Sequence, residues 1–182
     1  MRRQIIISGI PASGKSTVGR AVAAALGLAM LDKDEFLEAL FNSEGIGDPE
    51  WRTRLSRSAD EILREKALCS DGAVITSWWR HPSSRVNSGT PVEWLSSLSG
   101  VTIELHCICN PQVAANRFLS RKRHEGHLDH LKIPADVVAN FEEQAALGPL
   151  GVARLVKVET DRTVEMSAVL AQINFALDLS LR

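Results

Sequence analysis

One stretch near the start of the chain limits what this sequence can fold into. Residues 9–17 read GIPASGKST and match the pattern G-x-x-x-x-G-K-[ST] at every defined position. Residues 3–8 before it form a short apolar run rich in β-branched side chains, which is typical of a buried strand, and residues 18–26 after it are rich in alanine, which favours a helix. A strand, a glycine-containing loop and a helix in this order predict a phosphate-binding loop.

The residue types of this loop suit a triphosphate. Gly9 and Gly14 allow the backbone to fold closely around an anion, and the N–H groups of the loop and of the helix N-terminus then point at phosphate oxygens. Lys15 is expected to reach the β- and γ-phosphates, Ser16 to bind Mg²⁺ through its hydroxyl, and Thr17 to contact the α-phosphate. The nucleotide-binding residues predicted from the loop are Gly9, Ala12, Ser13, Gly14, Lys15, Ser16 and Thr17.

The composition restricts the class of protein. A chain of 182 residues, 45% of them hydrophobic, suits one domain with a buried core, so we expect a single domain over residues 1–182. The 21 basic and 22 acidic residues nearly cancel, which argues against a broad nucleic-acid or membrane surface. We find no apolar run of membrane-spanning length and no signal peptide. The three cysteines include no C-x-x-C pair, so we expect a reduced, cytoplasmic protein.

Strand-like and helix-like segments alternate along the whole chain. Strands are expected at residues 3–8, 28–32, 73–77, 101–109 and 154–159. Helices are expected at residues 18–26, 35–41, 51–69, 91–98, 110–122, 134–147 and 163–179. This alternation predicts an α/β fold of three layers, with a five-stranded parallel sheet and helices on both of its faces. Ligands of such sheets bind outside the carboxyl ends of the strands, where the glycine loop also lies.

Two carboxylates follow the second expected strand. Asp32 and Asp34 are two residues apart, so in an extended chain both side chains would lie on one side. Transfer of a phosphoryl group to an alcohol needs one acid near Mg²⁺ and one that holds the hydroxyl. We assign Asp32, with Ser16, to the metal and Asp34 to the acceptor hydroxyl; capping of the next helix is the structural alternative for Asp34. The third strand ends in ITSW without an acid, so Asp32 is the acid expected to hold the metal.

Arginines are spaced R-x-x-x-R-x-R after the fourth strand. Arg117, Arg121 and Arg123 begin a small helical lid that we predict over residues 117–133, and on a helix positions 117 and 121 share a face. We expect Arg117 to stack on the adenine ring, and Arg121 and Arg123 to bind the transferring phosphoryl group. A solvated basic helix face is the alternative. A mobile lid excludes water on closing, so that phosphate goes to the substrate.

The loop after the third strand is the expected specificity element. Residues 78–85 read WWRHPSSR at the carboxyl end of that strand. Trp78 is suited to stack on a sugar ring, and Arg80 and Arg85 are suited to pair with a carboxylate or a phosphate. The alternative is that a tryptophan packs under the lid and that the arginines are solvated. The substrate-binding residues predicted from these patterns are Asp34, Trp78, Arg80 and Arg85.

These motifs, in this order, resemble the small P-loop kinases, the group of gluconate kinase and shikimate kinase. The resemblance covers the chain and is specific in its first third, up to LDKD at residues 31–34. In that group the D-x-D pair serves magnesium and the acceptor hydroxyl, and RKRH at residues 121–124 is similar to the lid of gluconate kinase. Residues 158–163 resemble the loop on the adenine side, which implies nucleotide contacts for Asp161 and Arg162. The opening is also similar to chloramphenicol phosphotransferases and to the kinase half of polynucleotide kinases.

The leading hypothesis is an ATP- and Mg²⁺-dependent kinase that phosphorylates a hydroxyl of a small polar metabolite such as a sugar acid. Lys15, Asp34 and Arg121 are the predicted catalytic residues, and Ser16 and Asp32 form the predicted metal site. The expected partners are ATP and the small substrate, without a membrane or nucleic acid, in a monomer or a dimer. Two alternatives stay open: a kinase for an antibiotic or a polynucleotide 5′-hydroxyl, and a nucleotide-binding regulatory module with little catalysis.

The acceptor is not defined by these motifs. SWWR at residues 77–80 stands where shikimate kinases carry a glycine triplet. EFL at residues 35–37 follows the D-x-D pair, where gluconate kinases have a histidine. The resemblance therefore implies the reaction class and leaves the identity of the alcohol open.

Overall fold

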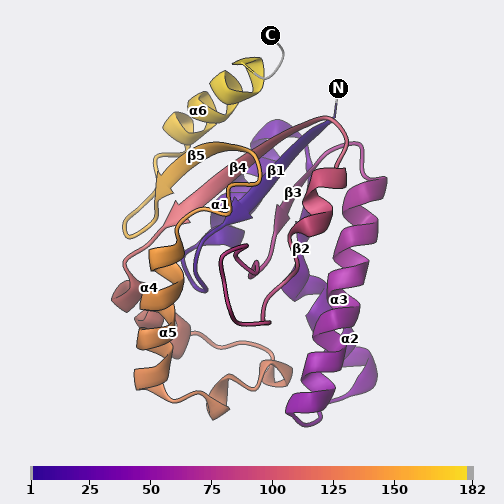
Figure 1. The fold of residues 1–182 in the computed structure, drawn as a ribbon, viewed down its shortest axis with the longest axis vertical. Helices are drawn as coiled ribbons and strands as arrows, with labels where there is room; N and C mark the ends of the chain where they lie inside the picture. The colour runs from indigo at the N-terminus through magenta and orange to yellow at the C-terminus, as the bar shows by residue number, and fades with distance from the viewer. Residues whose placement is uncertain (1, 180–182) are drawn as a thin grey trace.

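Five strands form one parallel sheet in the order β2-β3-β1-β4-β5 (Figure 1). The structure is a computed structural model and describes residues 2–179. The strands are β1 (Arg3–Ser8), β2 (Ala29–Asp32), β3 (Ala73–Thr76), β4 (Val101–Ile108) and β5 (Arg154–Glu159). In the centre of the sheet, Ile7 of β1 lies opposite Thr76 of β3 and Leu105 of β4. Because the strands are parallel, the loops that follow them leave the sheet at one edge.

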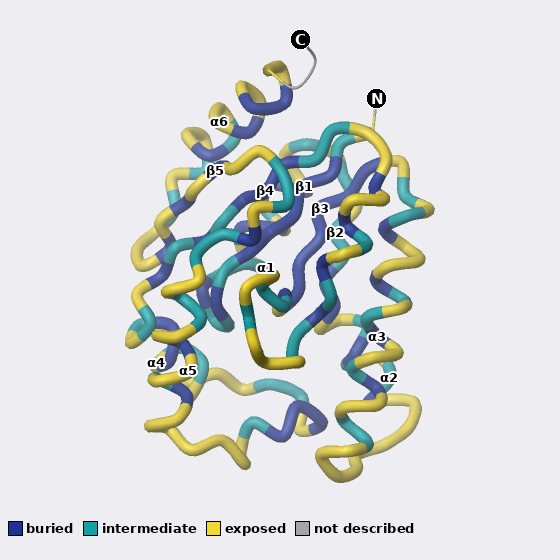
Figure 2. Tube along the Cα trace, in the orientation of Figure 1, coloured by how far each residue is buried: buried dark blue, intermediate teal, exposed yellow. Residues whose placement is uncertain are grey.

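Helices cover both faces of the sheet and its carboxyl edge. They are α1 (Lys15–Leu26), α2 (Lys33–Glu44), α3 (Pro49–Cys69), α4 (Pro111–Ser120), α5 (Pro134–Leu147) and α6 (Met166–Leu179), with short 3₁₀ helices η1 (Glu93–Ser97), η2 (Glu125–His127) and η3 (Asp129–Leu131). Ile5 and Ile7 of β1 pack with α1 and α6, whereas Ile6 packs with α3 on the other face. The sheet is therefore the buried middle layer, as Figure 2 shows. Within residues 2–179, no helix is long and apolar enough to span a membrane.

The predicted three-layer α/β fold is confirmed, and the strands lie where the sequence predicts them, with small differences at their ends. Two helix predictions need correction. Residues 91–98 contain the 3₁₀ helix η1 instead of an α-helix. α4 ends at Ser120, because Arg121 has extended backbone angles, φ −76° and ψ 145°. The helical face that Arg117 and Arg121 were expected to share therefore does not exist.

A buried carboxylate fixes the strand that leads into the glycine loop. Glu104 of β4 is fully buried and accepts hydrogen bonds from Ser8 Oγ (2.6 Å) and from the N–H groups of Leu150 (2.7 Å) and Gly151 (2.9 Å). These bonds satisfy the carboxylate, which would otherwise be costly to bury. They tie the end of β1 to the chain segment that precedes β5, and so hold the base of the loop in place.

Candidate active site

The glycine loop connects β1 to α1 at the carboxyl edge of the sheet. Gly9 has a φ of +130°, and a Cβ atom there would lie 2.5 Å from the carbonyl oxygen of Cys107. Gly14 has a φ of +90°, a conformation that other residues rarely adopt. The two defined glycines of the motif are therefore required, one by the close approach to β4 and the other by the left-handed turn into α1.

The first turn of α1 is open to an anion. Gly14 is the N-cap residue, and no side chain from residues 2–179 caps this helix by a hydrogen bond. The N–H groups at a helix N-terminus carry a positive potential and lack partners within the helix. An anion such as a phosphate is the ligand that this end of α1 suits.

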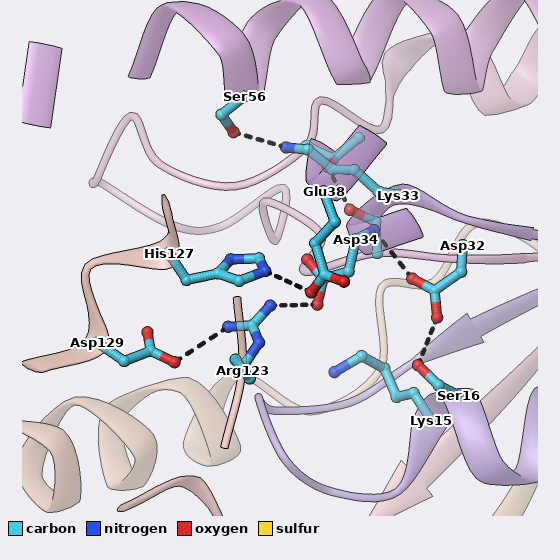
Figure 3. A network of polar contacts seen from close by, with 12 residues as sticks. Lys15, Ser16, Asp32, Lys33, Asp34, Glu38, Ser56, Arg123, His127 and Asp129 are labelled. Carbon is cyan, nitrogen blue, oxygen red and sulfur yellow. Dashed lines mark hydrogen bonds and ion pairs between the residues drawn. The ribbon is translucent and has the colours of Figure 1, made fainter. Parts of the chain in front are cut away.

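Lys15 extends over the loop into the space that Asp34 and Arg123 border (Figure 3). Its amino group donates hydrogen bonds to the carbonyl oxygens of Gly9 (2.9 Å) and Ile10 (2.8 Å). Burial lowers the pKa of the Lys15 amine from 10.5 to about 8, although the carboxylate of Asp34 acts in the opposite direction. The amine is therefore held in position without a direct carboxylate partner.

Asp32 joins the glycine loop to the second strand. Its carboxylate accepts a hydrogen bond from the hydroxyl of Ser16 (2.6 Å) and another from the N–H of Asp34 (3.0 Å), which caps α2 (Figure 3). Burial raises the pKa of Asp32, and the Ser16 hydrogen bond opposes this shift. The capping residue of α2 is Asp32, so the structural alternative for Asp34, capping of this helix, does not apply. One expectation is corrected: the two acids do not lie in one extended segment, because α2 begins at Lys33.

Asp34 lies in the first turn of α2 and faces the lid. Its carboxylate is 2.5 Å from a guanidinium nitrogen of Arg123, and about half of its side chain is exposed (Figure 3). Burial acts to raise the pKa of Asp34, but the positive charges of Arg123 and Lys15 help to hold that pKa below its usual range. Asp34 is therefore a carboxylate at neutral pH. It can accept a hydrogen bond from an alcohol, which suits an orienting role.

The lid is docked on α2 and α3 through a buried turn. His127 is buried, and its Nε2 lies 2.8 Å from Glu38 Oε1 of α2 (Figure 3). The Nε–H of Arg52 on α3 donates to the carbonyl oxygen of His127 (3.0 Å). A Cβ atom on Gly126 would lie 2.5 Å from the ring of Phe41, so this glycine allows the turn to pack closely. Gly126 and His127 are thus buried parts of the predicted lid, whereas its mobility stays a prediction.

The three predicted lid arginines have different surroundings. The guanidinium of Arg121 lies 4.7 Å from the ring centre of Phe118, and Arg123 pairs with Asp34. Arg117 instead donates hydrogen bonds to the carbonyl oxygens of Thr160 (2.9 Å) and Asp161 (3.0 Å). Its guanidinium therefore fixes the loop after β5, and stacking of Arg117 on a base remains a prediction.

One large cavity brings most of the predicted site together. It has a volume of about 1050 Å³ and lies at the carboxyl edge of the sheet, between the glycine loop, α2, the lid and α5. The predicted residues that line it are Ala12, Gly14, Lys15, Ser16, Thr17, Asp32, Asp34, Trp78, Arg117, Arg121, Arg123 and Arg162. Such a cavity, with an anion cradle at one end and a carboxylate at the other, has the parts required to hold a phosphorylated donor and a hydroxyl acceptor.

A family comparison now identifies the chain. The family model described as AAA domain matches residues 5–147, which is most of the sequence. The chain belongs to the AAA domain family. Its relatives include the shikimate kinase of Corynebacterium glutamicum, 30% identical over 101 residues that cover 50% of this chain and 56% of the relative. The shikimate kinase of Mycobacterium ulcerans is 33% identical over 82 residues, 41% of each protein. The chain thus spans about half the length of the curated relatives it matches.

Solved structures resemble this AAA-domain chain over nearly its whole length. A crystal structure from Chloroflexus aurantiacus has a TM-score of 0.75 at 24% identity and covers 97% of this chain and 96% of its own. Shikimate kinase from Acinetobacter baumannii, solved in complex with shikimate, has a TM-score of 0.63 at 18% identity, with 100% and 96% covered. A gluconokinase from Sinorhizobium meliloti has a TM-score of 0.54 at 21% identity, with 100% and 98% covered. The predicted small P-loop kinase fold is confirmed.

Five predicted site residues of this AAA-domain chain lie outside the large cavity. Arg80 and Arg85 line a second, smaller cavity instead, because the chain after Trp78 turns away from Asp34. Asp161 is exposed, and its carboxylate accepts a hydrogen bond from the N–H of Asn110 (2.7 Å), which ties the start of α4 to the loop after β5. The expectation that Arg80 and Arg85 share one pocket with Asp34 is corrected.

The remaining two members of the predicted set are part of the loop itself. Ser13 is fully buried beneath the cavity surface. Gly9 lines the second cavity through its backbone, on the side of the loop away from α1. Both are therefore positioned to shape the glycine loop.

Several residues of the cavity were not selected as site residues from the sequence. Arg52 of α3 lines it, and burial lowers the pKa of this arginine. Asp129 lines it too, and its carboxylate lies 3.4 Å from Arg123. From the sequence, Arg52 is a further candidate for the acceptor pocket, with surface charge as the favoured alternative, and Asp129 belongs to a polar run. The missing information is the position of α3 opposite the lid, which no local pattern encodes.

Proposed function

We propose that this AAA-domain chain is an ATP- and Mg²⁺-dependent kinase that transfers the γ-phosphoryl group to a hydroxyl of a small polar metabolite. The observation that carries the proposal is the shared cavity, in which Lys15, Asp34 and Arg121 lie together with the open N-terminus of α1. The relatives named shikimate kinase support the same reaction class. A regulatory nucleotide-binding module would need the cradle but has no need of Asp34 facing it.

The residues present fit a magnesium ion. Hydroxyl and carboxylate oxygens are the protein ligands that Mg²⁺ prefers, and Ser16 and Asp32 bring one of each together. Burial raises the pKa of Asp32, and the closest cation with which it forms an ion pair, Arg20, is 3.9 Å away, so a bound dication would stabilise the ionised carboxylate. When bound, Mg²⁺ neutralises part of the charge on the β- and γ-phosphates.

The side chains of the cavity have different roles in the proposed reaction. Lys15 and Arg121 supply positive charge where the phosphoryl group is transferred. Asp34 accepts a hydrogen bond from the acceptor hydroxyl and aims its oxygen at the phosphate, which is chiefly an orienting role because the pKa of Asp34 is low. Arg123 neutralises Asp34 through their ion pair and becomes free to contact phosphate when an acceptor hydroxyl takes its place. The lid, docked through His127, excludes water from this space.

The acceptor end of the cavity favours an anionic alcohol. Arg52 lies near Asp34 and Asp129, and Lys132 lines the same cavity. Arginine and lysine at this position are suited to a carboxylate, as in a sugar acid. We therefore infer that the small metabolite carries a negative charge.

A substrate panel tests the proposed function. ATP consumption with Mg²⁺ should rise severalfold above the hydrolysis background with at least one small alcohol, and carboxylated polyols should exceed their neutral counterparts. The panel includes sugar acids, neutral polyols, an antibiotic alcohol and an oligonucleotide with a 5′-hydroxyl. A flat response with tight ATP binding would indicate a regulatory module, and a response to the oligonucleotide alone would indicate a polynucleotide kinase.

Nucleotide affinity is expected to fall as the pH rises through about 8. Lys15 binds phosphate as an ammonium ion, and burial lowers the pKa of its amine to about 8. Below this pH the amine is already charged, whereas above it each binding event has to take up a proton. The dissociation constant for ATP with Mg²⁺, measured by calorimetry, should therefore rise about tenfold between about pH 7 and about pH 9.

The buried thiols do not interfere with this measurement. Burial raises the pKa of Cys107 to about 12 and the pKa of Cys109 to about 11, so both stay neutral in this range. The control is Lys15→Ala, which lacks the titrating amine. Its weaker binding should show no comparable rise, and an equally steep rise in this variant would contradict the assignment.

A further inference from the structure

A second cavity lies beside the first at the carboxyl edge of the sheet. Its volume is about 380 Å³, and it is enclosed by the loop after β3, the end of β4 and the C-terminal half of α5. Trp78 and Asn140 line both cavities, so the two are neighbours. The indole N–H of Trp78 donates to Gln144 Oε1 of α5 (2.8 Å), which holds the ring between them. Nothing in the proposed kinase mechanism uses this second space.

The second cavity contains a cation without a partner. The Nε of Arg80 is buried and has no hydrogen-bond acceptor in the part of the chain that the structure describes. The guanidinium of Arg80 also forms no ion pair with any of residues 2–179. Arg80 as a whole is half-buried, and a buried polar atom of this kind normally has a hydrogen-bond partner. The missing partner points to an anionic ligand.

The backbone around Arg80 is fixed, so the guanidinium is presented from a rigid base. The N–H of Arg80 donates to the carbonyl oxygen of Thr90 (2.8 Å), and the N–H of Thr90 donates to the carbonyl oxygen of Trp78 (2.8 Å). The buried indole of Trp79 donates to the carbonyl oxygen of Ile7 in β1 (2.8 Å). The loop is thus anchored to the sheet just before Arg80 and to Thr90 at Arg80 itself, which reduces the entropy lost when a ligand binds.

The ionisable groups that line this cavity give it a net positive charge. Both ring nitrogens of His81 have partners within the protein: Nε2 lies 3.0 Å from the carbonyl oxygen of Pro149, and Nδ1 accepts from the N–H of Ser83 (3.0 Å). His106 bonds to a hydroxyl, and burial lowers the pKa of its ring. The charges that remain are those of Arg80 and Arg85 against that of Glu143.

We propose that the second cavity is a binding site for a carboxylate or phosphate group, with Arg80 as the cation that recognises it. The group has two possible sources. It belongs either to the far end of the acceptor, which then reaches past Trp78, or to a separate small anion. This proposal can be tested independently of the proposed kinase activity, because anion binding to the second cavity can be measured without turnover.

Nuclear magnetic resonance of nitrogen-15-labelled protein tests the site. The nucleotide site is first filled with Mg²⁺ and a non-hydrolysable ATP analogue, so that added anions do not compete for the glycine loop. Malonate and inorganic phosphate are then titrated while the Nε–H signal of Arg80 and the indole signal of Trp78 are followed, assigned through Arg80→Gln and Trp78→Phe. We expect both signals to shift and saturate with at least one anion. Unchanged signals with both anions at high millimolar concentration would overturn the proposal.

Matched variants separate specific binding from a general salt effect. In Arg80→Gln the Trp78 signal should need about tenfold more anion for the same shift, which is the loss expected for a charge-assisted pair. Arg57→Gln removes an exposed arginine of α3 that lines neither cavity, and its titration should match that of the wild type. Equal titrations of Arg80→Gln and wild type would show that Arg80 is not the recognising cation.

Kinetics then distinguish the two sources. If the anionic group belongs to the acceptor, Arg80→Gln raises KM for anionic acceptors about tenfold and leaves KM for ATP unchanged. If it belongs to a separate anion, the acceptor KM is unchanged while the Trp78 titration is still weakened. Anion binding in a protein without any kinase turnover would refute the proposed function and leave this site in place.

Discussion

Replacing Lys15 by alanine is expected to lower turnover about a thousandfold or more while the chain stays folded. The ammonium of Lys15 is held by the carbonyl oxygens of Gly9 and Ile10 at the mouth of the anion cradle, so no neighbouring side chain can take its place. We expect the chain to stay folded without this amine. Because burial lowers the pKa of the amine to about 8, the charged form disfavours the folded state below that pH.

The measurement combines the steady-state rate with thermal unfolding followed by circular dichroism. Lys157→Ala serves as the control, since Lys157 is exposed on β5 and lines neither cavity. It should keep the wild-type rate. A rate for Lys15→Ala within tenfold of the wild type would remove this lysine from the mechanism. If Lys15→Ala were unfolded, Lys15→Met, which keeps the aliphatic stem, would have to show the same loss of rate in a folded protein.

The fold could be predicted because each strand is encoded by its own residues. Ile5, Ile6 and Ile7 are buried on alternate faces, and a short β-branched run of this kind has few other stable arrangements. The glycine loop then fixes the connection from β1 to α1, since Gly9 and Gly14 adopt conformations that other residues avoid. Local sequence and tertiary structure agree at these positions, and the prediction succeeded there.

The details of the D-x-D segment and the lid depend on contacts between distant residues. Whether Asp32 or Asp34 caps α2 is decided by where the strand ends, and both residues are acceptable caps by type. The buried turn at Gly126 and His127 forms against Phe41 and Glu38, which lie far away in the sequence. A polar stretch rich in histidine gives no local sign of this burial.

The direction of the loop after β3 could not be predicted from the sequence either. Trp78 and Trp79 are adjacent and similar in type, yet the first separates the two cavities and the second is buried against β1. This choice places Arg80 in the second cavity instead of the first. Thr90 holds this direction by its hydrogen bonds with Trp78 and Arg80, across residues 81–89, which contain no regular element.

Replacing Asp34 by asparagine is expected to lower turnover by about 100- to 10,000-fold, with ATP affinity changed by less than about threefold. Asparagine keeps the size of the side chain and loses the charge that attracts the acceptor hydroxyl. The measurement is the rate with saturating acceptor beside the dissociation constant for ATP. Glu35→Gln, the same chemical change at the next position of α2, removes an exposed ion pair with Arg20 and should leave the rate unchanged. Wild-type turnover in Asp34→Asn would contradict the role assigned to this carboxylate.

A double-mutant cycle with Arg123 separates catalysis from lid docking. Asp34 and Arg123 form an ion pair, so Asp34→Asn also removes an anchor of the lid. If that anchor were its sole contribution, Asp34→Asn would cause no further loss in an Arg123→Gln background, because the pair is already broken there. If Asp34 orients the acceptor, the substitution still lowers turnover about 100-fold or more in that background. The second result is the expected one, since the carboxylate is half exposed to the cavity and has room for a second partner.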